Sequence, residues 1–164
     1  MNALLKSDES KEVEATGRRA SGLHARAQNG CVVCGEANPI GLRLQFAQEG
    51  DGSMAARWQP TESWEGFKGL VHGGIISTVL DEAMSKAVAA QKREALTGEL
   101  RVRFRHHVTA GESLRVRAWV VATARRLVRA EATLIAADGS ERAHAWATFL
   151  VLPGSAVFTE ENQL

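Results

Sequence analysis

The chain has 164 residues, of which 45% are hydrophobic and 24% are charged, as in an ordinary folded domain. A formal net charge of +1 gives no electrostatic case for nucleic acid or a membrane as partner, and no apolar run approaches the ~20 residues of a membrane span. With only two cysteines and no apolar segment typical of a signal peptide, we expect one cytoplasmic domain with free thiols.

The ends of the chain differ from its middle. Residues 1–28 are rich in charged and small residues, with few apolar ones, and we expect a mobile leader there. We place one folded domain at residues 29–153 and a loose tail at residues 154–164.

The first motif of the domain is a pair of cysteines, Cys31 and Cys34, followed by a turn rich in Gly, Asn and Pro. A single CxxC is half of a zinc site. His24, His106 and His107 are candidates for further ligands, but their spacing does not require it. A redox pair is the third interpretation. We favour buried or half-buried structural thiols, and we expect no metal and no cofactor.

Two strands are expected next. Residues 42–47 alternate between apolar and polar with period two, residues 50–52 form a turn, and residues 53–58 return as a second strand that ends before Pro60. Residues 61–68 then form a loop or a short helical turn that carries Trp64 and Phe67.

The only long helix is expected at residues 73–93. Its apolar residues repeat at the spacing of one buried helical face, and they are Ile75, Ile76, Val79, Leu80, Ala83, Met84, Ala87 and Val88. Gly73 and Gly74 leave the N–H groups of the helix start bare, where the helix dipole favours a developing oxyanion.

The spacing of Gly74 and Asp81 is informative. Seven residues correspond to about 700° of rotation and about 10 Å of rise, so the two share a face but lie too far apart for one small reacting group. A two-fold dimer with antiparallel helices would bring Asp81 of one chain to Gly74 of the other. The simpler alternative is that Asp81 is a solvated helix residue and the glycines form only a tight turn.

Four long β-rich segments follow the helix, at residues 97–108, 113–123, 126–136 and 142–152. In the first of them, Leu100, Val102 and Phe104 alternate with arginines. The order of elements predicts an α+β fold in which an antiparallel sheet wraps around one central helix.

Two motifs of the chain resemble a known family. Val71-His72-Gly73-Gly74, followed by Leu80-Asp81-Glu82-Ala83, resembles the hotdog-fold acyl-CoA thioesterases of the phenylacetate-degradation (PaaI-like) type. Upstream, Cys31-Val32-Val33-Cys34-Gly35 with Asn38-Pro39-Ile40-Gly41-Leu42 is similar to a signature of one branch. The resemblance covers roughly residues 30–152, and it implies the hotdog arrangement of sheet and helix.

The resemblance also implies a reaction, which is hydrolysis of an acyl-CoA thioester. Asp81 would be the general base or the nucleophile, and Gly74 of the partner chain would supply the oxyanion N–H. Thr97 resembles the Ser or Thr that hydrogen-bonds the carboxylate or its water in relatives, although it is also an ordinary residue at a strand start. His72 would orient the carbonyl or only stabilise the turn. A homodimer or a dimer of dimers is implied.

Two positions depart from the family pattern. Gly66 stands where some relatives carry a polar side chain, often Asn, and His106-His107 stands where many carry a proline. We favour a surface position for the two histidines, with a phosphate contact or a pH-sensitive spot as alternatives.

Substrate contacts are expected from Gly73 and Glu82, and from Trp64 and Phe67 as walls of an acyl pocket. The arginines of the sheet's outer face, Arg103 and Arg105 among them, are candidates for the CoA phosphates, with a plain solvated face as the alternative. A non-catalytic acyl-CoA-binding module and a hotdog dehydratase or hydratase are the competing functions. The acyl group, the choice between dimer and tetramer, and the pathway do not follow from the sequence.

Overall fold

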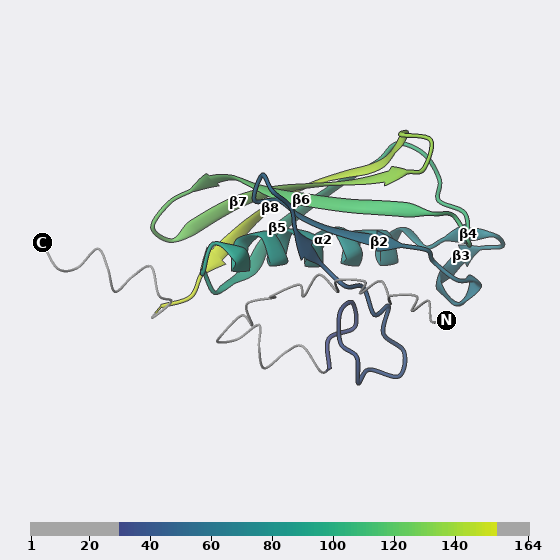
Figure 1. Cartoon of the computed structure of the whole chain (residues 1–164), viewed down its shortest axis with the longest axis horizontal. Coiled ribbons are helices and arrows are strands. Elements are labelled where there is room, and N and C mark those ends of the chain that lie inside the picture. The colour runs from purple at the N-terminus through teal and green to yellow at the C-terminus, as the bar shows by residue number, and fades with distance from the viewer. Residues whose placement is uncertain (1–29, 154–164) are drawn as a thin grey trace, which may run out of the picture.

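The computed structural model describes residues 30–153. The predicted leader at 1–28 and tail at 154–164 lie outside the described residues, and so does His24. Within them, one long helix, α2 (Gly73–Ala90), lies across one face of a six-stranded antiparallel sheet (Figure 1). This arrangement confirms the predicted α+β fold.

The strand order in the sheet is β1-β2-β6-β7-β8-β5. The strands are β1 (Ala47–Gln48), β2 (Met54–Trp58), β5 (Ala95–Phe104), β6 (Leu114–Thr123), β7 (Leu127–Ala136) and β8 (Glu141–Val151). A short 3-10 helix, η1 (Glu62–Trp64), and a small hairpin of β3 (Glu65–Phe67) and β4 (Leu70–Val71) lead into α2. The strand β5 forms one edge of the larger sheet, so one side of its backbone is unpaired within the described chain.

The core lies between α2 and the sheet. The helix buries the predicted apolar face from Ile76 to Val88, while Ile75 is half-buried. Many of the strand residues that face it are alanines, which let the helix approach the sheet closely. These small buried residues are Ala118, Ala130, Ala132, Ala143, Ala145 and Ala147.

The predicted first strand at residues 42–47 is largely wrong, because only Ala47–Gln48 pairs with β2. Arg43 has a φ of 56°, in the left-handed region, which interrupts an extended chain. The N–H groups of Leu42 and Leu44 donate instead to the carbonyls of Val32 and Val33, at 2.8 Å each. This segment is therefore fixed to the loop that carries the cysteines, and Figure 1 shows it on the side of α2 away from the sheet.

The ends of two further elements differ from the prediction. The helix ends at Ala90 rather than Arg93, because Lys92 takes a left-handed φ of 59° and reverses the chain. The strand β5 begins at Ala95 and ends at Phe104, short of the predicted Val108. No helix within residues 30–153 combines the length and the apolar character that crossing a membrane demands.

Candidate active site

The start of α2 is capped by the side chain of the preceding residue. His72 has extended backbone angles, and its Nδ1 accepts a hydrogen bond from the N–H of Gly74 at 2.8 Å. A Cβ added to Gly74 would lie 3.0 Å from this nitrogen, closer than ordinary contacts allow. Glycine therefore keeps this amide close to the imidazole ring, and the N–H already has one partner in the single chain.

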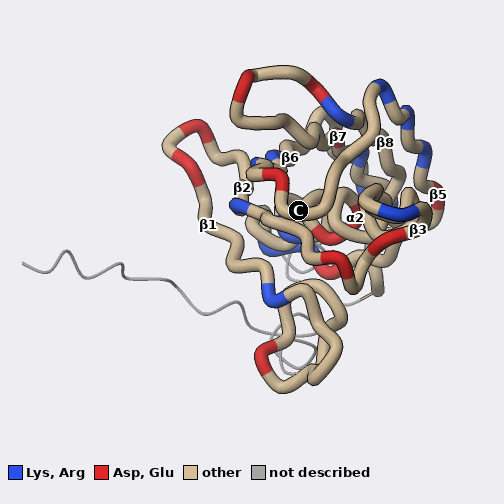
Figure 2. Tube along the Cα trace, turned by 90° about the vertical axis from the view of Figure 1, so that its right-hand side faces the viewer, with Lys and Arg blue, Asp and Glu red and all other residues tan. Residues whose placement is uncertain are grey.

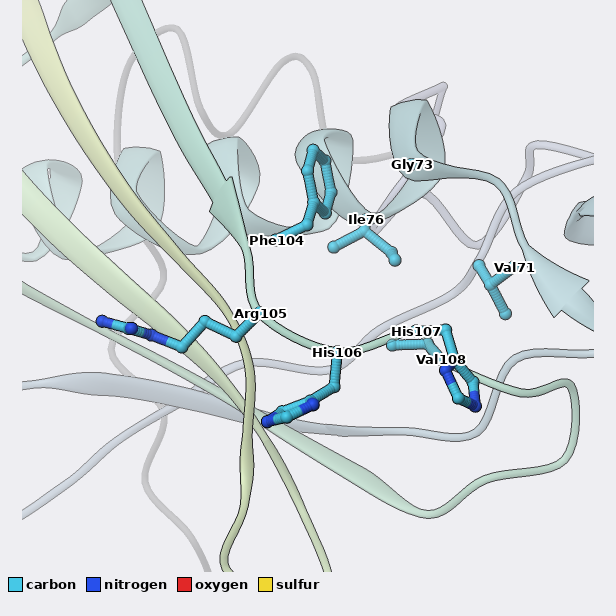
Figure 3. Close-up of a pocket in the computed structure, with 8 residues that line it drawn as sticks. All are labelled: Val71, Gly73, Ile76, Phe104, Arg105, His106, His107 and Val108. Carbon is cyan, nitrogen blue, oxygen red and sulfur yellow. The ribbon is translucent and has the colours of Figure 1, made fainter.

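A pocket of about 320 Å³ lies beside this helix start. Its walls come from Val71 on β4, from Gly73 and Ile76 on α2, and from residues 104–108, which are the last residue of β5 and the four that follow it (Figure 3). A Cβ on Gly73 would meet the ring of Phe104 at 3.3 Å, so the small residue leaves room there. The two histidines 106 and 107 are exposed, as expected, but they also line this pocket, which the sequence did not indicate.

Asp81 lies two turns further along α2, and it faces β5. The hydroxyl of Thr97 donates to its Oδ1 at 2.8 Å. Burial raises the pKa of Asp81 above the usual range of aspartic acid; the hydrogen bond from Thr97 acts in the opposite direction, and the charge of Glu82 adds to the rise. A carboxylate with a raised pKa is a stronger base than an exposed one, which suits it to accept a proton.

A β-bulge turns Thr97 toward Asp81. Thr97 pairs with the buried Phe149, whereas Glu99 pairs with Thr148, so Gly98 is the extra residue between them. If the alternation of Arg101 and Glu99 continued without the bulge, Thr97 would point outward as well. Gly98 inside an otherwise alternating strand was the available sequence signal, and the sequence prediction did not use it.

Glu82, the next residue on the helix, has a different set of partners. Its Oε1 accepts a hydrogen bond from the Cys34 thiol at 3.0 Å and lies 3.3 Å from the ammonium of Lys86. Both cysteines are half-buried free thiols. Because Glu82 contacts the cysteine loop, a direct role for it in substrate binding stays a prediction.

The other residues predicted to contact the substrate do not form one cluster in the single chain. Trp64 packs against the core, and its carbonyl accepts the His72 N–H at 2.8 Å, whereas Phe67 on β3 is 82% exposed. Arg105 lines the pocket and is paired with Glu141. Arg103 lies opposite His144 in the sheet register. Figure 2 shows the basic residues spaced along β5.

The comparisons with known proteins agree with this architecture. The family model described as "Thioesterase superfamily" matches residues 68–143, from the hairpin before α2 into β8. This part of the chain is therefore similar to the thioesterase superfamily. No curated protein sequence matches the chain.

Three solved structures show the hotdog fold of these thioesterases. A thioesterase superfamily protein aligns with a TM-score of 0.71 and 22% identity, over 73% of this chain and 62% of its own, so this chain spans less than two thirds of that protein. The Escherichia coli PaaI protein from the phenylacetic acid degradation operon aligns with a TM-score of 0.69 and 17% identity, over 80% of this chain and 91% of that one. A hypothetical thioesterase from Streptococcus pneumoniae with coenzyme A aligns with a TM-score of 0.63 and 16% identity, over 66% and 85%. The resemblance to PaaI-like hotdog thioesterases is thereby confirmed.

Proposed function

We propose that this protein hydrolyses an acyl-CoA thioester to the free acid and CoA, at a site formed between two copies of the chain. The observation that carries the proposal is the pair of Asp81 and Thr97. It presents a half-buried carboxylate with a raised pKa on the helix face that also carries the glycine-rich start of α2.

Relatives of the same fold support the substrate class and the residue pair. The pneumococcal protein is described with coenzyme A, and its solved variants replace an aspartate and a threonine by alanine. Those two positions are sixteen residues apart, as are Asp81 and Thr97 here. We infer the same partnership in this chain.

Hydrolysis of a thioester requires one base and one hydrogen-bond donor for the oxyanion. Asp81 takes a proton from water while the water oxygen attacks the thioester carbon, and the C–S bond then breaks with the CoA thiolate as leaving group. The proton on Asp81 passes to that thiolate or to solvent, which restores the carboxylate. In the alternative route, Asp81 attacks first and water cleaves the resulting anhydride. Both routes require Asp81 to be ionised.

The second copy is inferred from the edge strand β5. Leu96, Leu100 and Phe104 are 53%, 37% and 50% exposed along it, which is unusual for large apolar residues next to a free sheet edge. Antiparallel pairing of β5 with β5 of a partner would cover them. It would also bring Thr97 and Asp81 of one chain toward the C-terminal end of β5 in the partner chain. The partner's pocket beside Gly73 lies at that end.

In this arrangement, the N–H of Gly74 would stabilise the oxyanion. It now donates to the ring of His72, so the substrate oxygen would replace or share that acceptor. His72 would thereby hold the amide in its direction before substrate arrives. Arg103 and Arg105 are proposed to contact the CoA phosphates from the outer side of β5, and Trp64 and Phe67 to contact the acyl group.

Release of free thiol from a panel of acyl-CoA esters tests the proposal. We expect turnover of at least one ester, together with its loss in Asp81→Asn and its retention in Glu36→Gln, an exposed carboxylate outside the site. Tight binding of CoA esters without thiol release would instead identify a non-catalytic binding module. Equal turnover by well-folded Asp81→Asn would remove Asp81 from the mechanism.

A further inference from the structure

The two cysteines and one glutamate come together on the far side of α2 from the sheet. One ligand atom from each of Cys31, Cys34 and Glu82 lies within 4.8 Å of the other two. The sequence alone favoured structural thiols without a metal, because the second half of a zinc motif was missing. Glu82 is 48 residues from Cys34 in the chain, so only the folded structure shows the third ligand.

The loop around the cysteines is folded as a tight turn that orients both sulfurs. The Gly35 N–H donates to the Cys31 carbonyl at 2.9 Å, and the Val33 N–H points to the Cys31 sulfur at 3.4 Å. Metals bind the thiolate form of cysteine, and this N–H is placed to donate to a metal-bound Cys31 sulfur. Val33 is 2% exposed and fixes the turn in the core.

We propose that Cys31, Cys34 and Glu82 bind one thiophilic divalent cation of the zinc type, with solvent as the fourth ligand. Two thiolates and one oxygen ligand fit the preference of zinc for sulfur and oxygen in a tetrahedral arrangement. Binding breaks the two S–H bonds, releases both protons to solvent and forms two metal–sulfur bonds. With metal–sulfur bonds near 2.3 Å, two sulfurs in a tetrahedral site stand roughly 3.8 Å apart, a spacing that small side-chain rotations provide.

The local charge also fits such an ion. Two thiolates, one carboxylate and a divalent cation carry one net negative charge. The ammonium of Lys86, 3.3 Å from Glu82 Oε1, offsets it. An exposed site would not need this compensation, but these groups are half-buried.

The redox interpretation has less support from the same contacts. Burial, together with the hydrogen bond to Glu82 and its charge, raises the pKa of the Cys34 thiol to about 12. Reactive cysteines of redox pairs have lowered pKa values instead. A metal ion overcomes this barrier because it binds the thiolate directly.

The ion would fasten residues 30–35 to α2, one position from Asp81. This site does not depend on the thioesterase proposal, because no substrate contact enters the argument. Its effect would be to hold the loop and Glu82 in place beneath the helix face that carries Asp81.

Cobalt and zinc titration of the full-length protein tests the site. The protein is purified, freed of metal with a chelator, kept reduced with a phosphine and titrated with Co²⁺. We expect one Co²⁺ per chain, a near-ultraviolet thiolate-to-cobalt charge-transfer band, and displacement of the cobalt by Zn²⁺. Cys31→Ser and Cys34→Ser should abolish the band, and Glu82→Gln should weaken binding about tenfold or more. Glu36→Gln on the same loop should bind as the unmodified chain does.

Absence of the thiolate band in the reduced unmodified protein overturns the proposal, whether or not the cysteine variants fold. Binding that is equal in the two serine variants would show an adventitious ion only, and it also overturns the site. A Cys31–Cys34 disulfide that forms on removal of the phosphine, with no cobalt bound before, would favour the redox interpretation instead.

Discussion

Replacement of Gly74 by alanine separates catalysis from folding at the start of α2. The added Cβ would lie 3.0 Å from Nδ1 and 3.1 Å from Cε1 of His72, so the ring must move by a few tenths of an ångström. The hydrogen bond of 2.8 Å between the Gly74 N–H and this ring is lost or weakened. Loss of a helix cap costs about 1 kcal/mol.

Alanine also stabilises a helix relative to glycine, by about 0.5–1 kcal/mol. The two effects nearly cancel, so the free energy of unfolding should change by no more than about 1 kcal/mol. For a chain of this size, that corresponds to a shift of about 2–4 °C in the melting temperature. The fold therefore survives the substitution.

Activity should respond much more strongly. Alanine keeps the backbone N–H, but its methyl group occupies space beside the N–H that we propose to meet the oxyanion; loss of one such contact typically costs about 10²–10³ in kcat. We expect a loss on the order of 10² in kcat, with a smaller effect on KM because the interaction develops in the transition state. Gly50→Ala is the matched control, because its Cβ would meet nothing within 4 Å. Unchanged kcat in a Gly74→Ala protein with an unchanged melting temperature would refute the role of this amide.

Three further substitutions test the Asp81 side of the site. Thr97→Val removes the hydrogen bond that lowers the pKa of Asp81, so the acidic limb of the pH profile for thiol release should move to higher pH, whereas Thr97→Ser should leave it in place. Gly98→Ala puts a Cβ 2.9 Å from Leu150 Cγ and should reduce kcat about tenfold by disturbing the bulge, with Gly50→Ala again as control; an unaltered rate would separate the bulge from catalysis. Asp81→Asn should melt at a higher temperature than the unmodified chain at pH 7. Because burial raises the folded-state pKa of Asp81, the stability that its protonated form contributes is present below the unfolded pKa of about 3.9 and is lost as the pH rises through the folded value. Thermal melts from pH 3 to pH 8 should show the difference closing at low pH, and a constant difference would contradict this reasoning.

The fold was predicted from segments in which apolar residues repeat at a regular spacing. The helix carries apolar residues at helical spacing, and the segments after it are long and β-rich, with clear alternation in the first, so their order alone predicted a sheet around a helix. The first strand failed because Leu42 and Leu44 alternate correctly but Arg43 adopts a left-handed φ, and their amides bond to the cysteine loop. Such a tertiary contact has no local signal in the sequence.

The candidate site was predictable only in part, because some of its contacts join segments that are far apart in the chain. Asp81, Gly74 and Thr97 were named from the helix spacing and the family motifs, and the structure brings Thr97 to Asp81. The hydrogen bond from Gly74 to His72 depends on a ring orientation that the sequence does not specify. The contact between Cys34 and Glu82 joins segments far apart in the chain, so no pattern of spacing could indicate it.

The central claim is that Asp81 of one chain acts together with Gly74 of another, and mixing two inactive variants tests it most directly. Asp81→Asn and Gly74→Ala proteins are unfolded together in equal amounts, refolded and assayed for thiol release. In random dimers, half of the pairs are mixed and each mixed pair holds one intact site, so about one quarter of the unmodified activity should return. If the mixture is no more active than its separate components, although exchange of subunits is shown by mass spectrometry, the shared site is contradicted.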